Sequence, residues 1–139
     1  MTSSHGARMA LSLLVLIVGC SHATRRGPLP PQHRIDGAFA GTIALTGADI
    51  REGPVRIEFH EGRYQVQGSK DLAPPSQGAY TLDRRLLLED QGVHTAEFDW
   101  TLILKGWFDY AFDGRELILE QHDVAHGRHR RIVLRPIPE

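Results

Sequence analysis

The sequence is poor in cysteine, carries no large excess of charge, and has no apolar run long enough to cross a membrane as a helix. Cys20 is the single cysteine, which excludes a disulfide framework and a cysteine-rich zinc module. With 16 Lys and Arg against 17 Asp and Glu, the formal net charge is −1, so the basic surface of a nucleic-acid-binding protein is not expected. Since 41% of the 139 residues are hydrophobic, we expect one domain with a packed core.

Motifs for catalysis and nucleotide binding are absent as well. The sequence contains no G-x-S-x-G nucleophile motif, no phosphate-binding glycine loop and no H-E-x-x-H zinc motif. Four carboxylates (Asp109, Asp113, Glu116 and Glu120) fall on neighbouring predicted strands, where we expect an exposed sheet face rather than an acid–base pair. The arginines expected to balance them are Arg115, Arg128 and Arg130. The sequence therefore predicts a protein that is not an enzyme and uses no cofactor.

The first 19 residues have the pattern of a secretory signal peptide. Arg8 gives the segment a short positive start, and residues 9–19 (MALSLLVLIVG) form an uncharged run of 11 residues. A helix needs about 20 apolar residues to span a bilayer, so this run is too short for that role. Its length suits the apolar segment of a signal peptide, which we place at residues 1–19.

The apolar run ends in Ile17-Val18-Gly19-Cys20, which resembles the lipobox of bacterial lipoproteins. The resemblance implies cleavage before Cys20 and attachment of lipid to its thiol. Because Ser21 rather than Asp follows Cys20, it also implies sorting to the outer membrane of a Gram-negative envelope, with the domain facing the periplasm. An uncleaved anchor and a buried strand with a chance cysteine are the alternatives.

Residues 20–34 are predicted to be a flexible, lipidated linker. Pro28, Pro30 and Pro31 prevent a continuous helix in this segment. Arg25 and Arg26 are too few for a lipid-binding basic cluster, which has ~4–8 such residues, so solvated linker charges are the favoured interpretation.

From about residue 37 onward, hydrophobic and polar residues alternate along the chain. This pattern predicts strands with one buried and one exposed face, and no convincing amphipathic helix follows residue 37. Asp113-Gly114, between two alternating runs, is the strongest hairpin signal in the chain. The residues predicted to face inward are Phe39, Ile43, Leu45, Val55, Ile57, Phe59, Tyr64, Val66, Tyr80, Leu82, Phe98, Trp100, Leu102, Leu104, Phe108, Tyr110, Phe112, Leu117, Leu119, Ile132 and Leu134.

These runs predict an all-β domain over residues 35–139, built as a small antiparallel up-and-down barrel of about eight strands. A flattened β-sandwich gives the same alternation and stays open as an alternative. Gly106 is interpreted as a bulge or corner inside one long strand. Trp107 has the opposite parity to Phe108, so its side chain is expected to point outward unless Gly106 shifts the register.

Residues 95–121 read TAEFDWTLILKGWFDYAFDGRELILEQ, in which two aromatic strands flank a glycine and a D-G turn leads to an L-x-L strand. This segment resembles the small lipocalin-like lipoproteins of bacteria, and the likeness extends loosely over residues 36–135. The sequence has Gly37-Ala38-Phe39 where true lipocalins have G-x-W, which argues against a large ligand cavity. The resemblance implies a calycin-type barrel among binding or envelope proteins, and it assigns no catalytic residue.

The interior of the predicted barrel is the first candidate site. Aromatic residues are dense between positions 98 and 112, and in a small barrel they either fill the core or line a pocket for an apolar ligand. In the second interpretation, the residues that line the interior are Tyr64, Tyr80, Trp100, Leu102 and Tyr110.

Residues 122–129 (HDVAHGRH) place three histidines around a predicted hairpin turn. Neutral imidazole binds Zn²⁺, Cu²⁺ and Ni²⁺ well, so His122, His126 and His129 form a candidate metal site, with His122 and His129 facing each other across the hairpin. The spacing matches no established metal motif and arginines surround it, so an exposed turn without a metal is the favoured interpretation.

Two functions fit these features. The first is a non-enzymatic, membrane-anchored envelope lipoprotein whose barrel binds a small apolar ligand. The second is a protein-binding module, such as an inhibitor or accessory factor of an envelope enzyme or machine. An apolar patch around Trp107, or a protruding loop at residues 68–77, would favour the second. An enzyme would require several of His94, His122, Asp123 and His129 to meet in one cleft.

Overall fold

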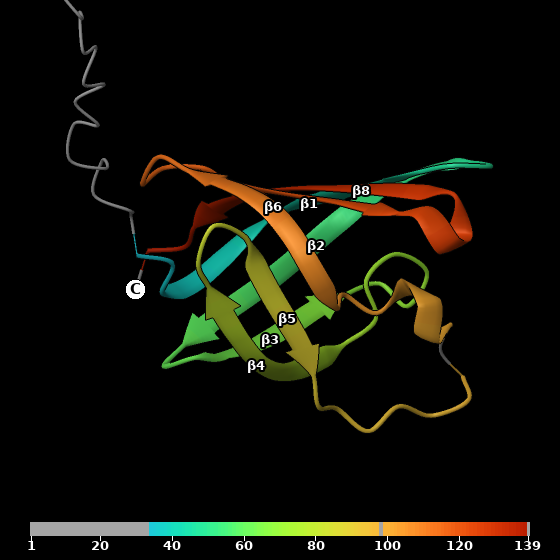
Figure 1. Cartoon of the computed structure of the whole chain (residues 1–139), viewed down its shortest axis with the longest axis horizontal. Helices are drawn as coiled ribbons and strands as arrows, with labels where there is room; N and C mark the ends of the chain where they lie inside the picture. The colour runs from blue at the N-terminus through green and yellow to red at the C-terminus, as the bar shows by residue number, and fades with distance from the viewer. Residues whose placement is uncertain (1–33, 98, 139) are drawn as a thin grey trace, which may run out of the picture. The chain divides into compact units, whose positions relative to one another are not determined.

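A computed structural model of the chain describes residues 34–97 and 99–138, in which eight antiparallel strands form one closed barrel (Figure 1). Two short 3₁₀ helices lie in its connections, η1 (Trp100–Leu102) and η2 (Val124–His126). No helix of the described residues is long and apolar enough to cross a membrane. The strands are β1 (Gly37–Thr46), β2 (Ile50–His60), β3 (Arg63–Gly68), β4 (Ser76–Leu82), β5 (Leu86–Asp90), β6 (Gly106–Phe112), β7 (Leu117–Asp123) and β8 (Arg128–Pro136).

Each strand pairs with the next one along the chain, and β1 also pairs with β8. Ile43 of β1 lies opposite Ile132 of β8 in this closing pair, which runs over eight residues of each strand. The predicted up-and-down barrel of eight strands is therefore confirmed. The sandwich alternative is wrong, because the pairing of β1 with β8 closes the sheet and leaves it no free edge.

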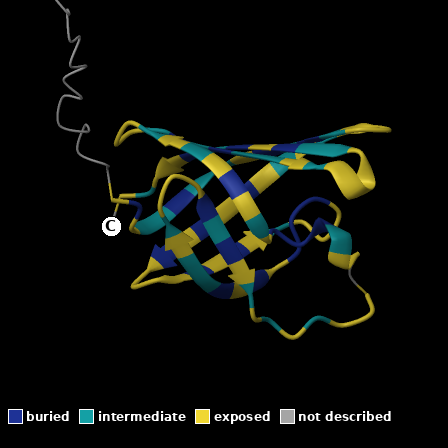
Figure 2. Cartoon of the chain, in the orientation of Figure 1, coloured by how far each residue is buried: buried dark blue, intermediate teal, exposed yellow. Residues whose placement is uncertain are grey.

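The two-residue period of the sequence decides which side chains fill the barrel. In β2, Val55 and Ile57 are buried while Arg56 and Glu58 between them are exposed. Figure 2 shows the same alternation of buried and exposed residues along the strands. A strand turns successive side chains to opposite faces, so one face of each strand supplies the core and the other meets solvent.

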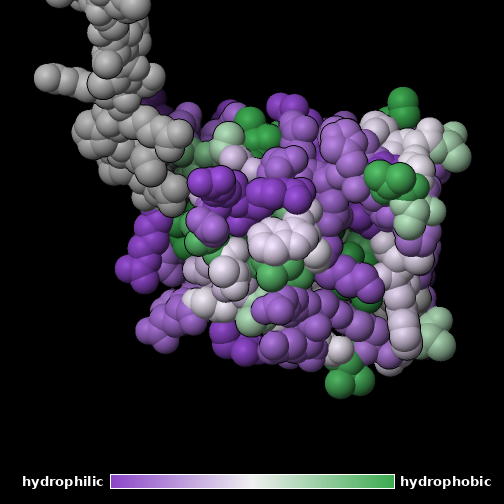
Figure 3. Space-filling model, viewed as in Figure 1, coloured by the Kyte–Doolittle hydropathy of each residue, from purple (hydrophilic) through white to green (hydrophobic). Residues whose placement is uncertain are grey.

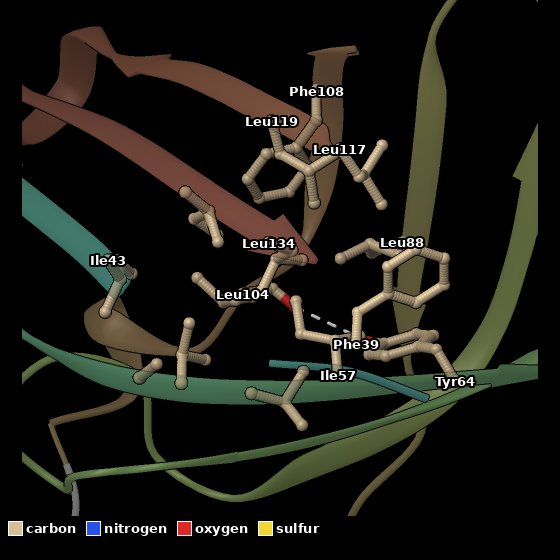
Figure 4. Packing of buried hydrophobic residues seen from close by; sticks show 14 of the residues in the cluster. Phe39, Ile43, Ile57, Tyr64, Leu88, Leu104, Phe108, Leu117, Leu119 and Leu134 are labelled. Carbon is tan, nitrogen blue, oxygen red and sulfur yellow. Dashed lines mark hydrogen bonds between the residues drawn. The ribbon is translucent and has the colours of Figure 1, made fainter. Parts of the chain in front are cut away.

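Side chains fill the lumen of the barrel. Phe39 packs edge-to-face against Phe59, with ring centroids 5.9 Å apart, and against Phe112 at 5.7 Å. Phe59 in turn contacts Tyr80 at 5.1 Å in the same geometry, which suits the charge distribution of aromatic rings. Figure 4 shows leucines and isoleucines from several strands converging beside the rings of Phe39 and Phe108.

The two ends of the barrel differ in their connections. At one end, short turns join β2 to β3, β4 to β5 and β6 to β7. At the other end, which we call the loop end, lie the β1–β2 turn, η2 and the longer loops 69–75 and 91–105. The loop end is on the right in Figure 1, while the described chain begins and ends on the left, where the Ile137 amide donates to the Ala38 carbonyl (2.8 Å).

The strand predicted through residues 98–104 is wrong, because residues 99–104 belong to the long loop before β6. Asp99 begins η1 by accepting a hydrogen bond from the Thr101 amide (2.9 Å). Leu102, Ile103 and Leu104 are buried in succession, which a strand with alternating side chains does not allow. Leu102 and Leu104 join the core at its loop end, so they are buried as predicted but from a loop. Phe98 lies outside the described residues.

Gly106 begins β6 rather than bending one long strand. Its φ of +88° lies in the left-handed region, which glycine adopts without steric cost, and this lets the loop turn into the barrel wall. Trp107 follows with its side chain outward and 48% exposed, as predicted. The Arg85 guanidinium lies over the Trp107 ring, 5.9 Å from its centroid.

Candidate functional site

Tyr64 is buried in the lumen, where it was predicted to line a ligand pocket. Its hydroxyl instead forms a hydrogen bond with the loop that covers the loop end of the core. It donates a hydrogen bond to the Leu104 carbonyl (3.4 Å), drawn as a dashed line in Figure 4. Burial raises the pKa of Tyr64 well above its ordinary value, and the charges of Asp90 and Glu89 raise it further. The phenol therefore stays neutral and ties β3 to the loop that covers the core.

Tyr80 and Tyr110 are partly buried against the core, and their hydroxyls also bind backbone carbonyls. Tyr80 donates to Ile35 (3.1 Å) and Tyr110 donates to Asp83 (2.8 Å). Both bonds lie toward the end opposite the loop end. The three tyrosines predicted to line an interior pocket thus hold barrel elements together.

Trp100 does not line the interior, and that part of the prediction is wrong. Its side chain is 55% exposed, because η1 turns it away from the core while the neighbouring Leu102 points in. The Trp100 indole Nε1 donates to the Thr95 carbonyl (3.0 Å), which fixes the ring at the surface of the loop end.

A buried arginine on β8 lies at the loop end of the barrel. Arg130 continues the inward-facing series of Leu134 and Ile132, and it is only 3% exposed. Its Nη1 donates to Gln121 Oε1 (2.7 Å) and its Nη2 to the Thr101 carbonyl (2.5 Å). Within residues 34–97 and 99–138, its Nε has no hydrogen-bond partner.

Asp123 supplies the carboxylate beside this arginine. Its Oδ2 lies 3.3 Å from Arg128 Nη2, 3.6 Å from Arg130 Nη1 and 2.9 Å from His126 Nδ1. Burial alone would raise the pKa of Asp123, but the hydrogen bond from His126 and the nearby positive charges outweigh it and lower the pKa. Burial also lowers the pKa of Arg130, an effect that Asp123 opposes.

A cleft of about 420 Å³, which we call the Trp100 cleft, opens beside this cluster between η1 and the β7–β8 connection. Its volume falls in the usual range for small-molecule sites, roughly 300–1,000 Å³. Its lining comes from the η1 loop, the entry to β6, the end of β7, η2 and β8. The residues are Trp100, Thr101, Ile103, Lys105, Gln121, His122, Asp123, Val124, Ala125, His126 and Arg130.

The sequence interpretation did not single out Arg130, Lys105 or Gln121 as members of a binding site. A signal for Arg130 was present, since it has the same parity as Ile132 and Leu134 and therefore had to face inward. No comparable signal existed for Lys105, because its place beside β7 depends on the loop between η1 and β6.

His122 and His129 lie opposite each other across the β7–β8 hairpin, as predicted, with their rings stacked at 4.4 Å. His126 instead binds the Asp123 carboxylate. In the described part of the chain, no group of three or more His, Cys, Asp or Glu is arranged to hold a metal ion. The structure thus does not bring the three candidate metal ligands together.

Three of the four residues named for an enzymatic site, His122, Asp123 and His129, line one open pocket of about 370 Å³ on the outer side of the β7–β8 hairpin, and His94 lies elsewhere. His94 Nε2 lies 2.6 Å from Asp90 Oδ2 and lines a different cavity of about 290 Å³. In the pocket that the other three share, His129 stacks on His122, and the Asp123 carboxylate is bonded to His126 and Arg128 rather than to either of these rings. His94 therefore shares no cleft with the other three.

The four carboxylates of β6, β7 and the turn between them meet solvent or arginines on the outer face, as predicted, but the partners differ from those expected. Asp113 caps the β6–β7 turn by accepting from the amides of Arg115 and Glu116, which lowers its pKa. Arg128 and Arg130 instead turn toward Asp123. The ion pairs on the outer face, with their N–O distances, are Asp109–Arg85 (2.9 Å), Glu116–Arg135 (3.5 Å) and Glu120–Arg131 (2.7 Å).

Two features that would favour a protein-binding module are not found. Arg85 covers the Trp107 ring, so that tryptophan does not form an apolar patch by itself. The loop at residues 68–77 does not protrude, since Leu72 and Ala73 are buried in the core. Arg51 also fastens this loop by donating to the Asp71 carbonyl (2.9 Å).

Comparisons with known proteins add no assignment to this geometry. No protein-family model, curated protein or solved structure matches the chain. The predicted signal peptide and Cys20 lie outside the described residues, as does the linker before Arg34. The closed barrel and its Trp100 cleft are therefore the features on which a function has to rest.

Proposed function

We propose that this protein is a membrane-anchored envelope lipoprotein whose barrel binds a small apolar ligand without catalysing a reaction. The ligand occupies the Trp100 cleft rather than the lumen. One observation carries the proposal: the lumen is packed with side chains, while a cleft of about 420 Å³ opens beside the exposed ring of Trp100. The size of the cleft suits a compact organic molecule.

The apolar lining of the cleft supports an apolar ligand. Trp100 offers a large aromatic surface, and Ile103, Val124 and Ala125 add aliphatic surface around it. Because the Trp100 indole is already held by Thr95, little side-chain freedom is lost when a ligand packs against the ring. Burying these surfaces together gains about 25 cal/mol per Å² of apolar area removed from water.

The proposed membrane anchor rests on Cys20 in the sequence. Lipid on Cys20 would hold the protein to the outer membrane, since each buried CH₂ contributes about 0.8 kcal/mol and multiple chains make attachment stable. The chain enters the barrel at Arg34, at the end opposite the loop end.

Fluorescence of Trp100 tests the proposal directly. The full chain with Cys20→Ser, which carries no lipid, also receives Trp107→Phe so that Trp100 is the only tryptophan. We expect the neutral apolar dye phenylnaphthylamine to quench Trp100 saturably with one site per chain. The matched Trp100→Phe variant, which keeps Trp107 on the barrel wall, should lose most of the dye binding. Absence of saturable binding to the intact chain would refute the proposal.

A protein partner at the same end is the second candidate function, as for an inhibitor or accessory factor of an envelope enzyme. In the described residues, four of the five exposed large hydrophobics lie at the loop end, namely Ile50, Val93, Trp100 and Val124. Figure 3 shows separate apolar side chains on the right, where the loop end lies. A photo-crosslinker at position 93 that captures one protein from intact cells, with no dye bound to the cleft, would favour this alternative.

A further inference from the structure

We infer that the ligand of the Trp100 cleft is an organic anion, with an apolar body packed on Trp100 and a carboxylate, sulfonate or phosphate group bound by Arg130 and Lys105. This inference rests on the proposed function and deepens it by naming the chemical class of the ligand. Three observations support it: the balance of charge, the state of the Arg130 guanidinium, and the position of Lys105.

Positive charge exceeds negative charge around the cleft. Arg128, Arg130 and Lys105 are opposed by two carboxylates, Asp123 and Asp99. The Asp123 carboxylate is fully engaged, since Arg128 and the ring of His126 both lie within hydrogen-bonding distance of it. A cationic ligand would thus meet an excess of like charge and no free carboxylate in this cluster.

The Asp99 carboxylate is also engaged, by hydrogen bonds within its own loop. Its Oδ1 accepts hydrogen bonds from the Thr101 amide (2.9 Å) and the Thr101 hydroxyl (2.6 Å), which begin η1 and lower the pKa of Asp99. These bonds hold the carboxylate in place as a helix cap. Asp99 keeps its negative charge, which is already counted in the balance above, but its Oδ1 is occupied by Thr101 and Asp99 does not line the Trp100 cleft.

Arg130 lines the Trp100 cleft with its guanidinium fixed in place. The Asp123 carboxylate beside it, at 3.6 Å, is shared with Arg128 and His126. Gln121 and the Thr101 carbonyl fix its two terminal nitrogens, so the planar guanidinium has a set orientation. Its Nε is buried without a partner among the described residues, and leaving a buried donor unpaired is unfavourable. An anionic oxygen beside the guanidinium would add an interaction that the low dielectric of a buried site strengthens.

Lys105 supplies a second, accessible positive charge. It immediately precedes β6, lines the Trp100 cleft and is exposed. In the described ranges its ammonium group forms no ion pair, whereas its backbone carbonyl accepts a hydrogen bond from Gln121 Nε2 (2.7 Å). The same glutamine binds Arg130, so Gln121 links the backbone at Lys105 to the guanidinium.

Two dyes with the same aromatic body separate the effect of charge from that of apolar contact. Anilinonaphthalene sulfonate differs from phenylnaphthylamine by its sulfonate, and each is titrated into the full chain with Cys20→Ser and Trp107→Phe. We expect the anionic dye to bind Trp100 about tenfold more tightly at low salt, with the ratio falling as salt screens the charges.

Single substitutions then locate the charge. Lys105→Met should weaken binding of the anionic dye by about threefold and leave the neutral dye unchanged, as expected for an exposed charge. Lys70→Met is the matched control, because Lys70 is the only other lysine of the sequence, is exposed and does not line the cleft. Arg130→Met, which keeps apolar volume at a buried position, should abolish the preference for the anion.

The possible outcomes are distinct. Equal affinity for both dyes would overturn the inference and leave the proposed function standing, whereas binding of neither dye would overturn both. Equal loss in the Lys70 and Lys105 variants would show nonspecific attraction and also overturn the inference. If Arg130→Met does not fold, as circular dichroism would show, the Lys105 variant and the salt dependence decide the result.

Discussion

Nη2 of Arg130 lies 2.5 Å from the carbonyl oxygen of Thr101, a contact between residues 29 positions apart in the sequence. The bond joins the inward face of β8 to η1, which carries the exposed ring of Trp100. The two sides of the Trp100 cleft are thus held together by a donor inside the barrel. The shape of this surface site consequently depends on the packing of the barrel end.

The stability of the loop end should reflect this contact. Arg130→Met removes a buried guanidinium and leaves Gln121 Oε1 without its donor, so we expect a loss of about 1–2 kcal/mol in the free energy of unfolding. Urea denaturation followed by circular dichroism measures it. Arg131→Met is the control: its ion pair with Glu120 is exposed, and its loss should cost less than about 1 kcal/mol. Equal effects for the two variants would contradict the role assigned to Arg130.

Tyr64 should matter more to stability than Tyr110. Tyr64→Phe leaves the buried Leu104 carbonyl without its donor and should cost about 1 kcal/mol. Tyr110→Phe removes a hydrogen bond to Asp83 at an exposed site, where water can replace the hydroxyl, so a smaller loss is expected. Thermal unfolding of both variants provides the comparison. A larger loss for Tyr110→Phe would show that the bond to Leu104 does not hold the loop.

Acid should weaken the barrel in part through Asp123. Its pKa is lower in the folded protein than its ordinary value of 3.8, so its stabilising effect is present above that value and is lost as the pH falls through the folded pKa. The difference in urea midpoint between the unsubstituted chain and Asp123→Asn should therefore be constant near neutral pH and shrink below about pH 4. Asp71→Asn removes an exposed charge as the control. A difference that persists unchanged into strong acid would contradict this account.

Lipidation is testable independently of the barrel. Cys20→Ala should abolish incorporation of labelled palmitate and release the protein from the membrane fraction, because no other cysteine is present. Ser21→Asp should keep the lipid and move the protein from the outer to the inner membrane, as the lipobox resemblance implies. Palmitate labelling with membrane fractionation separates the two effects. Labelling that survives Cys20→Ala would refute the predicted anchor.

Most of the fold was predictable from the two-residue alternation of hydrophobic and polar residues. It placed Phe39, Ile57 and Leu119 on inward faces, where they are buried, because a strand turns every second side chain to the same side. It also placed the β6–β7 turn at Asp113-Gly114. The alternation did not reveal β5, since Leu86 and Leu88 flank another leucine and the run shows no polar period.

The same alternation misled at residues 98–104. Leu102 and Leu104 are apolar because they cover the end of the core, whereas Trp100 is an apolar residue that lies at the surface. The three residues are spaced two apart, as they would be on one face of a strand, although they form a loop. Hydrophobic spacing indicates which residues are buried. Whether a strand or a loop carries these residues into the core depends on the rest of the fold. The pairing of β5 with β6 begins at Gly106, which lies opposite Leu88, so residues 99–104 precede it and take no part in the sheet.

The sequence by itself determined which strand residues face the core and where one sharp turn lies. The parity of β8 also put Arg130 on the inward face, so the expectation that Arg130 balances carboxylates on the exposed face is wrong. Local backbone geometry and the hydrophobic effect are sufficient for those features, because they act within one strand. Tertiary structure alone decided that the sheet is a closed barrel, since β1 pairs with β8 from the far end of the chain. It also decided the Trp100 cleft, which exists because Thr101, Gln121 and Arg130 meet through contacts that no local pattern encodes.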